Sequence, residues 1–439
     1  MLLRFSVENF RSIAEKQTLD LVASNYFKEL LNINSFSVES GEKLPRILRS
    51  TAIYGPNAAG KSSLVHSMDF VRWFIVESLK KTQIDEPIDV APFRLSSSFR
   101  DKDSSFEIVF LEKNEMGEKA KEGDQRFVRY QYGFRVNMRR ITEEWLIAYP
   151  NSRPQRWFHR AFDADKGAYR YDFGTAFKGG RLREDWKSQT RDNALFLSTA
   201  VQLNNEQLKP VFFWFSKRLK VLRPELPPPS RTFRRLESDP EEKILSFMKD
   251  MDLSIDGISF VKRPFSPERL PKHLPSELRE EMIREMSGKE VPDLKFLHAD
   301  PEGKESIPFD AGDESEGTRN LFSFSGLWLD MLEKEQILVI DEIDTSLHPL
   351  VVRRLIERLH CAGCQAQLIF TTHDSSLLAS GILRRDQIWF VEKNPRKATE
   401  LYPLSDFSVQ KGEALEKRYL SGRYGAIPFF RDLDLDEKK

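Results

Sequence analysis

Residues 55–62, Gly-Pro-Asn-Ala-Ala-Gly-Lys-Ser, have types and a spacing that suit phosphate binding. This segment, here called the phosphate loop, matches the pattern G-x-x-x-x-G-K-[ST]. Gly55 and Gly60 let the backbone curl, so that successive N–H groups and the start of the next helix point at phosphate oxygens. Lys61 is expected to reach the β- and γ-phosphates, and the Ser62 hydroxyl is expected to ligate Mg²⁺. The other residues expected to line the site are Pro56, Asn57, Ala58, Ala59 and Ser63.

The flanking sequence decides between this interpretation and its alternative, a glycine-containing turn that precedes a helix. Residues 47–54 predict a strand, and apolar residues at helical spacing over 63–80 predict a helix. A strand–loop–helix context is the one that the phosphate motif requires. We therefore predict a nucleotide site that takes ATP and Mg²⁺, although the motif alone does not distinguish ATP from GTP.

A second pattern supplies two acids at the end of a buried strand. Residues 337–340 are Ile-Leu-Val-Ile, and Asp341 and Glu342 follow them. The carboxyl ends of strands are where α/β sheets bind ligands. Asp341 is therefore expected to hold the Mg²⁺ hydration shell, and Glu342 to polarise the attacking water as a general base. Apolar strands followed by acids are common, so this pattern predicts hydrolysis only together with the phosphate loop.

A histidine at the end of another apolar run is the third candidate. Residues 368–374 are Leu-Ile-Phe-Thr-Thr-His-Asp, and His373 follows Asp341 by 32 residues, one strand–helix–strand step. The two strands can therefore be neighbours, which favours His373 as a sensor of the γ-phosphate. The alternative is a structural histidine that only forms hydrogen bonds at a strand end.

The elements that must position these residues indicate an α/β fold. Residues 106–147 predict an antiparallel meander, and strands that alternate with helices after 317 predict a mainly parallel sheet. Repeated prolines interrupt residues 224–275, and short charged helices are expected over 241–249 and 276–286. We expect three parts: an N-terminal lobe (1–200), a helical insertion (201–300) and a C-terminal lobe (301–439).

Composition excludes several classes of protein. The 439 residues include 68 Lys+Arg and 68 Asp+Glu, which argues against DNA binding through a field spread over the whole surface, but not against a local basic groove. A hydrophobic share of 40% excludes wholesale disorder, and two cysteines cannot form a disulfide scaffold. The first residues lack the apolar region of a signal peptide, and no apolar run is long enough to span a membrane. A cytoplasmic protein without a membrane partner is expected.

Three weaker signals have ordinary explanations. Cys361 and Cys364 have C-x-x-C spacing, but a second ligand pair for zinc is lacking, and two reduced thiols are favoured over a redox pair. Basic tracts at 181–183, 217–220 and 231–235 can contact phosphate backbones, although such tracts are more often solvated. Phe429 and Phe430 suit an anchor for a partner, but packing onto the chain itself is favoured.

Five segments together resemble the ABC-type ATPases of the SMC and RecF group. They are Asn9-Phe-Arg-Ser12, the phosphate loop, the strand that ends at Asp341-Glu342, Asp344-Thr-Ser-Leu-His-Pro349 and Thr371-Thr-His-Asp374. The whole chain more closely resembles the prokaryotic AAA-type ATP/GTP-binding protein family of RecF-like ATPases, which includes the ATPase subunit of the PARIS anti-phage system. Glu314-Ser-Glu-Gly-Thr-Arg319 and the tail at 418–428 also resemble that family.

The resemblance implies an ABC-type ATPase head with an antiparallel β subdomain, and it assigns further residues. Ser315 and Gly317 stand where the signature motif contacts the γ-phosphate held by a neighbouring subunit. Glu316 departs from the signature, and an ordinary helix N-cap at Ser315 is the alternative. Asp344 would lie in the loop that couples two sites across a dimer, and Arg11 would lie near the nucleotide.

The function that follows is an ATP-hydrolysing switch that assembles into a dimer or a larger homo-oligomer. The family link suggests that it controls a separate effector, such as a nuclease, in anti-phage defence. One alternative is a RecF-like DNA-repair ATPase that binds duplex DNA directly, so nucleic acid stays open as a partner. The other is the nucleotide-binding subunit of a transporter, which the altered signature disfavours.

Overall fold

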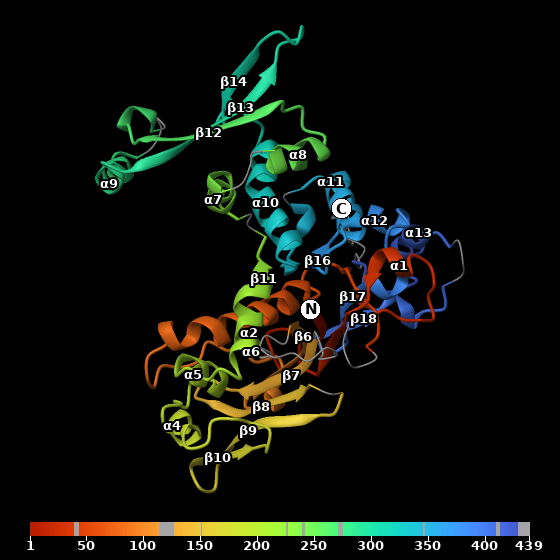
Figure 1. The fold of residues 1–439 in the computed structure, drawn as a ribbon. Coiled ribbons are helices and arrows are strands. Elements are labelled where there is room, and N and C mark those ends of the chain that lie inside the picture. Colours follow the sequence, from red (N-terminus) through yellow and green to blue (C-terminus); the bar gives the residue numbers. More distant parts are fainter. Residues whose placement is uncertain are drawn as a thin grey trace, which may run out of the picture. The chain divides into compact units, whose positions relative to one another are not determined.

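The computed structural model describes residues 1–38, 44–113, 127–150, 152–224, 227–238, 242–270, 275–345, 347–409 and 413–428. The chain forms two compact units, one built from Met1–Pro224 and Met331–Lys439, the other from Glu225–Asp330 (Figure 1). The second unit is an insertion, but its bounds differ from the expected 201–300. Residues 201–224 belong to the first unit because they supply a strand to its parallel sheet.

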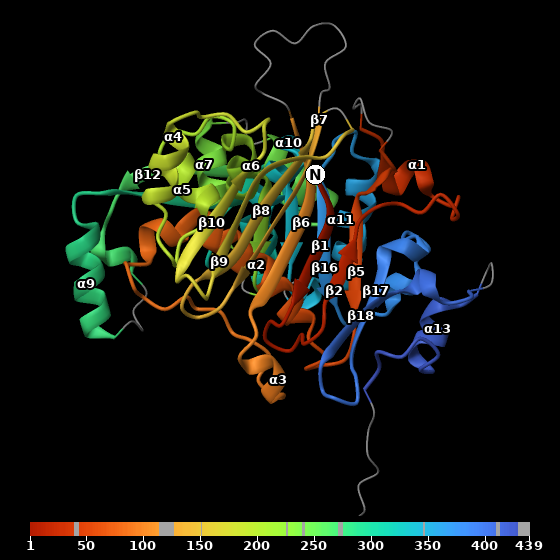
Figure 2. The same ribbon diagram turned by 90° about the horizontal axis from the view of Figure 1, so that it is seen from below.

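A seven-stranded antiparallel sheet forms one layer of the first unit (Figure 2). Its strands, in spatial order, are β10 (Ala168–Phe173), β9 (Gln155–Asp163), β8 (Ile141–Tyr149), β7 (Phe127–Val136), β6 (Ser104–Lys113), β1 (Leu2–Glu8) and β2 (Gln17–Asp20). Buried and partly exposed residues alternate along β8, as expected for a sheet with one face on the core. The predicted meander is confirmed, and it continues beyond 147 to β10.

A six-stranded sheet forms the second layer. Its strands, in spatial order, are β11 (Leu219–Leu222), β15 (Ile337–Ile340), β16 (Gln367–Thr372), β5 (Ser50–Tyr54), β17 (Ile388–Lys393) and β18 (Thr399–Pro403). All neighbouring strands are parallel except β17 and β18. Every residue of β5, β15 and β16 is buried, which explains their continuous apolar runs. The predicted mainly parallel sheet is confirmed.

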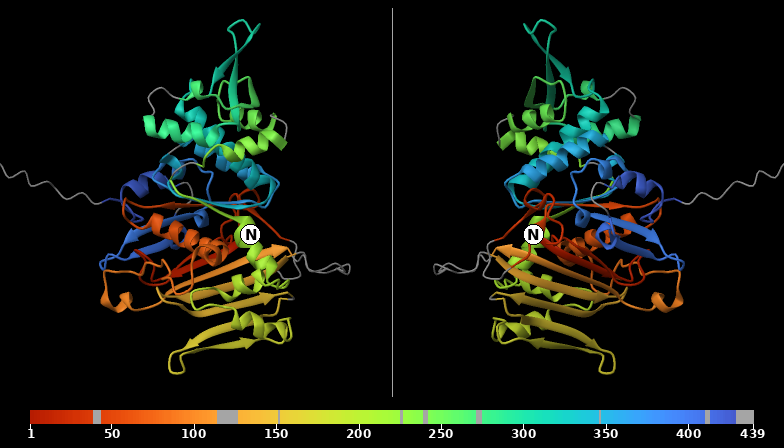
Figure 3. Two further views of the ribbon diagram at one scale, coloured as in Figure 1. Left: turned by 90° about the vertical axis from the view of Figure 1, so that its left-hand side faces the viewer. Right: turned by 90° about the vertical axis from the view of Figure 1, so that its right-hand side faces the viewer.

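Helix α2 (Lys61–Lys81) joins the two layers through one hydrophobic core. Its apolar face, including Leu64 and Phe74, shares a cluster with Phe134 of the antiparallel sheet and Val339 of the parallel sheet. Figure 3 gives side views of these layers.

The remaining helices and the small sheet of this unit are α1 (Leu31–Asn34), α3 (Ser97–Arg100), α4 (Leu182–Ser188), α5 (Phe196–Gln202), α6 (Lys209–Phe213), α11 (Pro349–Cys361), α12 (Ser376–Ala379), α13 (Leu415–Leu420), β3 (Ser35–Phe36) and β4 (Ile47–Leu48).

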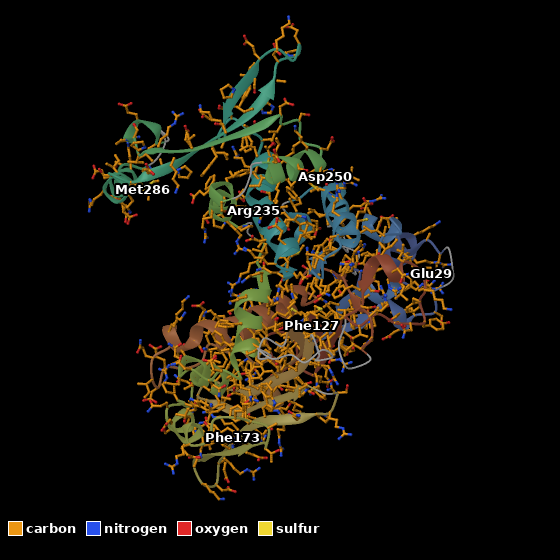
Figure 4. The ribbon with its side chains drawn as sticks, viewed as in Figure 1. Glu29, Phe127, Phe173, Arg235, Asp250 and Met286 are labelled. Carbon is orange, nitrogen blue, oxygen red and sulfur yellow. The ribbon has the colours of Figure 1, made fainter. Side chains whose placement is uncertain are left out.

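The second unit combines helices with a three-stranded antiparallel sheet. Its elements are α7 (Ser230–Ser238), α8 (Glu242–Asp250), β12 (Gly257–Pro264), α9 (Ser276–Met286), β13 (Glu290–Ala299), β14 (Ser306–Asp310) and most of α10 (Glu316–Glu333). The ring of Phe322 packs against those of Phe233 and Phe296, at centroid distances of 5.8 and 5.5 Å. Arg235 of α7 forms a 3.1 Å ion pair with Asp330 of α10. Figure 4 draws the side chains and labels Arg235 and Met286.

Within the described ranges, no helix has both the length and the apolar character needed to cross a membrane.

Candidate functional site

The phosphate loop lies at the carboxyl end of β5 and turns directly into α2. Both of its glycines are sterically required. A Cβ atom at Gly55 would clash with the carbonyl oxygen of Val391, and one at Gly60 would clash with Thr399 Oγ1. Gly60 also has a φ of 114° and caps α2 in a left-handed conformation. The phosphate loop therefore packs directly against strands β17 and β18, and this packing fixes its backbone conformation.

Lys61 connects the loop to the acids at the ends of the neighbouring strands. Its side chain is buried, and its Nζ donates to the carbonyl oxygen of Gly55 at 2.8 Å. Burial lowers the pKa of Lys61, whereas the nearby carboxylates of Glu342, Asp341 and Asp344 act in the opposite direction. The structure thus gathers the predicted lysine and the predicted acids around one point. A buried cation beside carboxylates is suited to hold a polyphosphate with its metal.

The two acids after β15 have different surroundings. Asp341 is buried, and its Oδ1 accepts a 2.7 Å hydrogen bond from Thr371 Oγ1 of β16. The same Thr371 oxygen accepts from the backbone N–H of Glu342 at 2.7 Å. Glu342 has a φ of 51°, a left-handed conformation that is uncommon for a residue with a side chain. Thr371 therefore fixes Asp341 directly and orients the strained backbone that carries Glu342.

His373 follows β16, the strand next to β15, as the spacing predicted. Its Nε2 lies 2.9 Å from Lys61 Nζ, and its backbone N–H donates to Asp344 Oδ2 at 3.0 Å. Burial and the Lys61 ammonium lower the pKa of His373, so the neutral ring is the form able to accept a hydrogen bond from Lys61. The other carboxylate oxygen of Asp344, Oδ1, is buried and has no hydrogen-bond partner. This unpartnered atom marks the site as incomplete without a ligand or ordered water.

A hydroxyl cluster that was not predicted supports the phosphate loop. Thr399 Oγ1 donates to the Ala59 carbonyl oxygen at 2.8 Å and contacts Ser12 Oγ at 2.8 Å. Ser12 in turn donates to Ser63 Oγ at 2.7 Å, and Lys393 Nζ donates to Thr399 Oγ1 at 3.0 Å. The segment Asn9–Ser12 thus contacts the phosphate loop through Ser12. Because this segment is part of the family resemblance, it could have indicated Ser12 as a site residue. No pattern singled out Thr399.

Arg11 lies beside this cluster, but its side chain faces solvent. It is exposed, its guanidinium carbon lies 5.8 Å from the ring centroid of Phe10, and its backbone N–H donates to Ala91 O at 2.6 Å. Its positive charge contributes, after burial, to a lowered pKa of His66 on α2. Arg11 is therefore near the first turns of α2, and a contact with nucleotide stays a prediction.

Ser315 and Gly317 belong to the second unit, at the start of α10. Ser315 Oγ accepts a 3.1 Å hydrogen bond from the backbone N–H of Thr318, which is the geometry of a helix N-cap. A Cβ atom at Gly317 would meet only Ser315 Oγ, at 3.7 Å. The alternative explanation of Ser315 is thus present in the structure, and its contact with a nucleotide on another subunit stays a prediction.

The C-terminal tail contacts the turn that follows His373. Ser375 Oγ donates to Glu416 Oε1 at 2.8 Å, and the ring of Tyr419 lies 5.8 Å from that of Tyr54, the residue before the phosphate loop. Tyr54 is fully buried and its hydroxyl has no partner. The sequence suggested only that this tail resembles a family, whereas the structure places it against both strand ends of the site.

The residues predicted to hold Mg²⁺ suit a metal that takes most ligands from phosphate and water. No group of three or more His, Cys, Asp and Glu side chains in the described part of the chain forms a metal cage. Mg²⁺ is commonly held through one or two carboxylates together with substrate phosphates and water. Ser62 at the start of α2 and the Thr371-oriented carboxylate of Asp341 fit that mode.

The weaker signals lie apart from this site. Cys361 ends α11, Cys364 follows it, and both thiols are free. Phe429 and Phe430 lie outside the described residues.

The sheet order and this cluster at its carboxyl end define an ABC-type P-loop ATPase head. The family model described as "AAA domain, putative AbiEii toxin, Type IV TA system" matches residues 50–379, and the chain belongs to this family. The match contains the phosphate loop, both acids and His373. No curated protein matches the chain.

Solved structures of SMC heads are similar to this chain at low identity. The SMC head domain from Thermotoga maritima has 13% identity and a TM-score of 0.38, with 93% of this chain and 99% of that chain covered. An Smc head bound to the C-winged helix domain of ScpA has 14% identity and a TM-score of 0.40, with 92% of this chain and 97% of that chain covered. An Smc head with an extended coiled coil, bound to the C-terminal domain of ScpA derived from Pyrococcus furiosus, has 12% identity and a TM-score of 0.38, with 96% and 98% covered. The assignment of the fold therefore rests on the strand order, the site and the family match.

Proposed function

We propose that this chain binds ATP with Mg²⁺ and hydrolyses its γ-phosphate. The observation that carries the proposal is the convergence of Lys61, the carboxylates at 341, 342 and 344, and His373 beside a glycine-constrained loop. This arrangement supplies a cation for the phosphates, an acid for the metal and a second acid for water.

Each group has a proposed task. On nucleotide binding, Lys61 exchanges its contacts with Gly55 O and His373 for the β- and γ-phosphates. Asp341 and Ser62 hold Mg²⁺, which neutralises charge on the phosphates. Glu342 accepts a proton from the attacking water, and His373 contacts the γ-phosphate once Lys61 has moved.

Hydrolysis in this proposal drives a switch between assembled and released subunits. Ser315 and Gly317 of one subunit contact the γ-phosphate held by another, Asp344 couples the two sites, and Arg11 lies at the edge of the nucleotide. The switch controls a separate effector, such as a nuclease, in anti-phage defence. The description of the matching family, which names a toxin–antitoxin system, supports a role of this kind. Direct binding of duplex DNA is the alternative, and it predicts an affinity of the ATP-bound chain that falls steeply with salt.

The experiment that tests the nucleotide site compares two lysines on one helix. Lys61→Ala is expected to weaken ATP binding by about 10- to 100-fold, because charge-assisted hydrogen bonds contribute roughly 1.5–3 kcal/mol. Lys80→Ala, an exposed residue at the other end of α2, is the matched control and is expected to bind normally. Calorimetric titration with ATP and Mg²⁺ measures both, and circular dichroism verifies folding. Unchanged affinity in a folded Lys61→Ala chain contradicts the proposal.

A further inference from the structure

A cavity borders the parallel sheet at the end opposite the nucleotide site. It has a volume of about 390 Å³, which is within the range of small-ligand pockets. Its wall includes residues that directly precede β11 and β15, two parallel strands whose starts pair as Leu219 with Ile337. The phosphate loop and the acids follow the carboxyl ends of the strands in this sheet. The cavity is therefore separate from the nucleotide site.

The cavity wall is strongly cationic. Its charged residues are Lys217, Arg218, Lys220 and Lys334, with Glu112 as the acid. Lys217 and Lys334 are exposed, and Arg218 forms a 3.4 Å ion pair with Glu112. Cations therefore outnumber acids among the residues that line the cavity, and such an excess attracts anions.

The backbone that carries two of these cations has an unusual geometry. Trp214–Arg218 forms a π-helical turn between α6 and β11, and such turns are rare and frequently occur at functional sites. The turn places Lys217 and Arg218 in the cavity wall. Phe213, which also lines the cavity, has its ring centroid 4.1 Å from Lys217 Nζ. An aromatic face beside clustered cations is suited to a ligand that combines a base with a phosphate.

A buried amide adds a second, independent indication of a ligand. Gln336 lines the cavity, is 6% exposed, and donates from Nε2 to the carbonyl oxygen of Lys217 at 2.9 Å. Its Oε1 is buried and has no hydrogen-bond partner. Two other buried glutamines stand at the amino ends of neighbouring strands: Gln367 begins β16 and Gln387 directly precedes β17. The Oε1 atom of each accepts a backbone N–H. The wall of the cavity therefore lacks one donor, which a ligand hydroxyl can supply.

We propose that this cationic cavity binds a phosphate monoester that carries hydroxyl groups and a flat base, of the size of a nucleoside monophosphate. The lysines and Arg218 contact the phosphate, the Phe213 ring packs on the base, and a ligand hydroxyl donates to Gln336. This chemistry occurs in free nucleotides and at the 5′ end of a nucleic-acid strand.

The test uses the full chain with Lys61→Ala, so that the phosphate loop contributes little to binding. Adenosine monophosphate, inorganic phosphate and a 5′-phosphorylated single-stranded oligonucleotide are titrated by calorimetry. Adding Lys217→Glu and Lys334→Glu together is expected to lower the affinity for adenosine monophosphate at least tenfold, since two attractive charges become repulsive. The matched control reverses Lys28 and Lys178, two exposed lysines that do not line the cavity, and is expected to bind like its parent.

Two comparisons make the outcome specific. Gln336→Met is expected to weaken the binding of adenosine monophosphate but not that of inorganic phosphate, because only the nucleotide carries ribose hydroxyls. If the oligonucleotide binds at least ten times more tightly than the mononucleotide, the cavity is assigned to a nucleic-acid end. If the mononucleotide binds at least ten times more tightly than the oligonucleotide, the cavity is assigned to free nucleotides. The proposal is overturned if none of the three probes binds, or if the charge-reversed chain is folded and binds as tightly as its parent.

Discussion

The two ends of the parallel sheet are built from different kinds of side chain. At the carboxyl ends, Lys61, Asp341 and His373 are charged or titratable and lie close together. At the amino ends of β16 and β17, the polar groups include the neutral amides Gln367 and Gln387, which are fully buried. The cationic cavity lies at the same end of the sheet, but before β11 and β15. The nucleotide site and this amide network therefore lie at opposite ends of one sheet and differ in charge.

The side chains of Gln367 and Gln387 in this amide network find their hydrogen-bond partners within the protein. Gln367 accepts from Leu2 N and donates to the carbonyl oxygens of Leu2 and Leu48, so it ties the antiparallel sheet to the parallel one. Gln387 donates to both oxygens of Ser50. At the carboxyl end, by contrast, Asp344 Oδ1 and the Tyr54 hydroxyl have no partner.

This difference indicates that the amide network of Gln367 and Gln387 stabilises the fold, whereas the nucleotide site is completed by its ligand. Buried polar groups that satisfy one another contribute to stability, whereas unpartnered groups lower it until a ligand completes them. Substitutions at the carboxyl end are therefore expected to change nucleotide chemistry more than stability. Substitutions in the amide network are expected to change stability more than nucleotide chemistry.

The largest expected effect is on turnover at the carboxyl end. Glu342→Gln is expected to lower the rate of ATP hydrolysis by about 10²- to 10⁴-fold, the usual contribution of a general base. ATP affinity and the melting temperature are expected to change little, because the amide has the same shape and the Thr371 hydrogen bond uses the backbone of residue 342. Steady-state phosphate release, ATP titration and thermal unfolding measure the three quantities.

Glu357→Gln on α11, which pairs with Arg353 at 2.9 Å, controls for the loss of a carboxylate elsewhere. Normal hydrolysis by Glu342→Gln would show that another group activates the water. A large loss of stability in Glu342→Gln would show that the nucleotide site also stabilises the fold.

The carboxyl-end residues were predictable from sequence because their signals are local. The phosphate loop is one continuous octapeptide, and Asp341 and His373 each follow an apolar run whose parallel pairing brings the strand ends together. The hydroxyl cluster was not predictable in this way. Ser12 and Thr399 are 387 residues apart, and a contact between single hydroxyls at that separation leaves no local pattern.

The three-stranded sheet of the second unit was missed for a different reason. Prolines in residues 224–275 indicated broken structure, and proline removes a ladder hydrogen bond from a strand. The structure nevertheless includes Pro292 in β13, the central strand, opposite Lys262 of β12, and Pro308 in β14. Tertiary pairing overrides local propensity here.

The amino end supplies the second prediction, a dependence of stability on pH. Burial and the Arg49 guanidinium lower the pKa of His360 to about 4, and its Nε2 contacts Ser50 Oγ at 2.8 Å. The unfolded chain therefore takes up a proton at His360 near pH 6.5, whereas the folded chain does so only near pH 4. The free energy of unfolding consequently decreases as pH falls through this interval. His360 is expected to account for about 2 kcal/mol of the stability lost between pH 7 and pH 5.

Urea unfolding of the wild type and His360→Gln at both pH values measures this contribution. The variant is expected to be less stable at pH 7 but to lose about 2 kcal/mol less than the wild type on acidification. ATP hydrolysis at pH 7 is expected to be unchanged in the folded variant. If both proteins lose the same free energy of unfolding between pH 7 and pH 5, His360 is not the cause of the loss.

The smallest expected effect tests whether the carboxyl end also depends on neutral hydroxyls. Thr399→Val keeps the shape of the side chain but removes its hydrogen bonds with Ala59 O, Ser12 Oγ and Lys393 Nζ. A loss of loop order equivalent to one such bond, about 1 kcal/mol, is expected to lower ATP affinity roughly fivefold. Thr18→Val, which removes a 2.9 Å contact with Ser6 Oγ between β1 and β2, is the matched control and is expected to leave ATP affinity unchanged. If Thr399→Val instead lowers only the melting temperature, the hydroxyl cluster supports the fold rather than the phosphate loop. The nucleotide site and the amide network then differ less in their contribution to stability than their charges suggest.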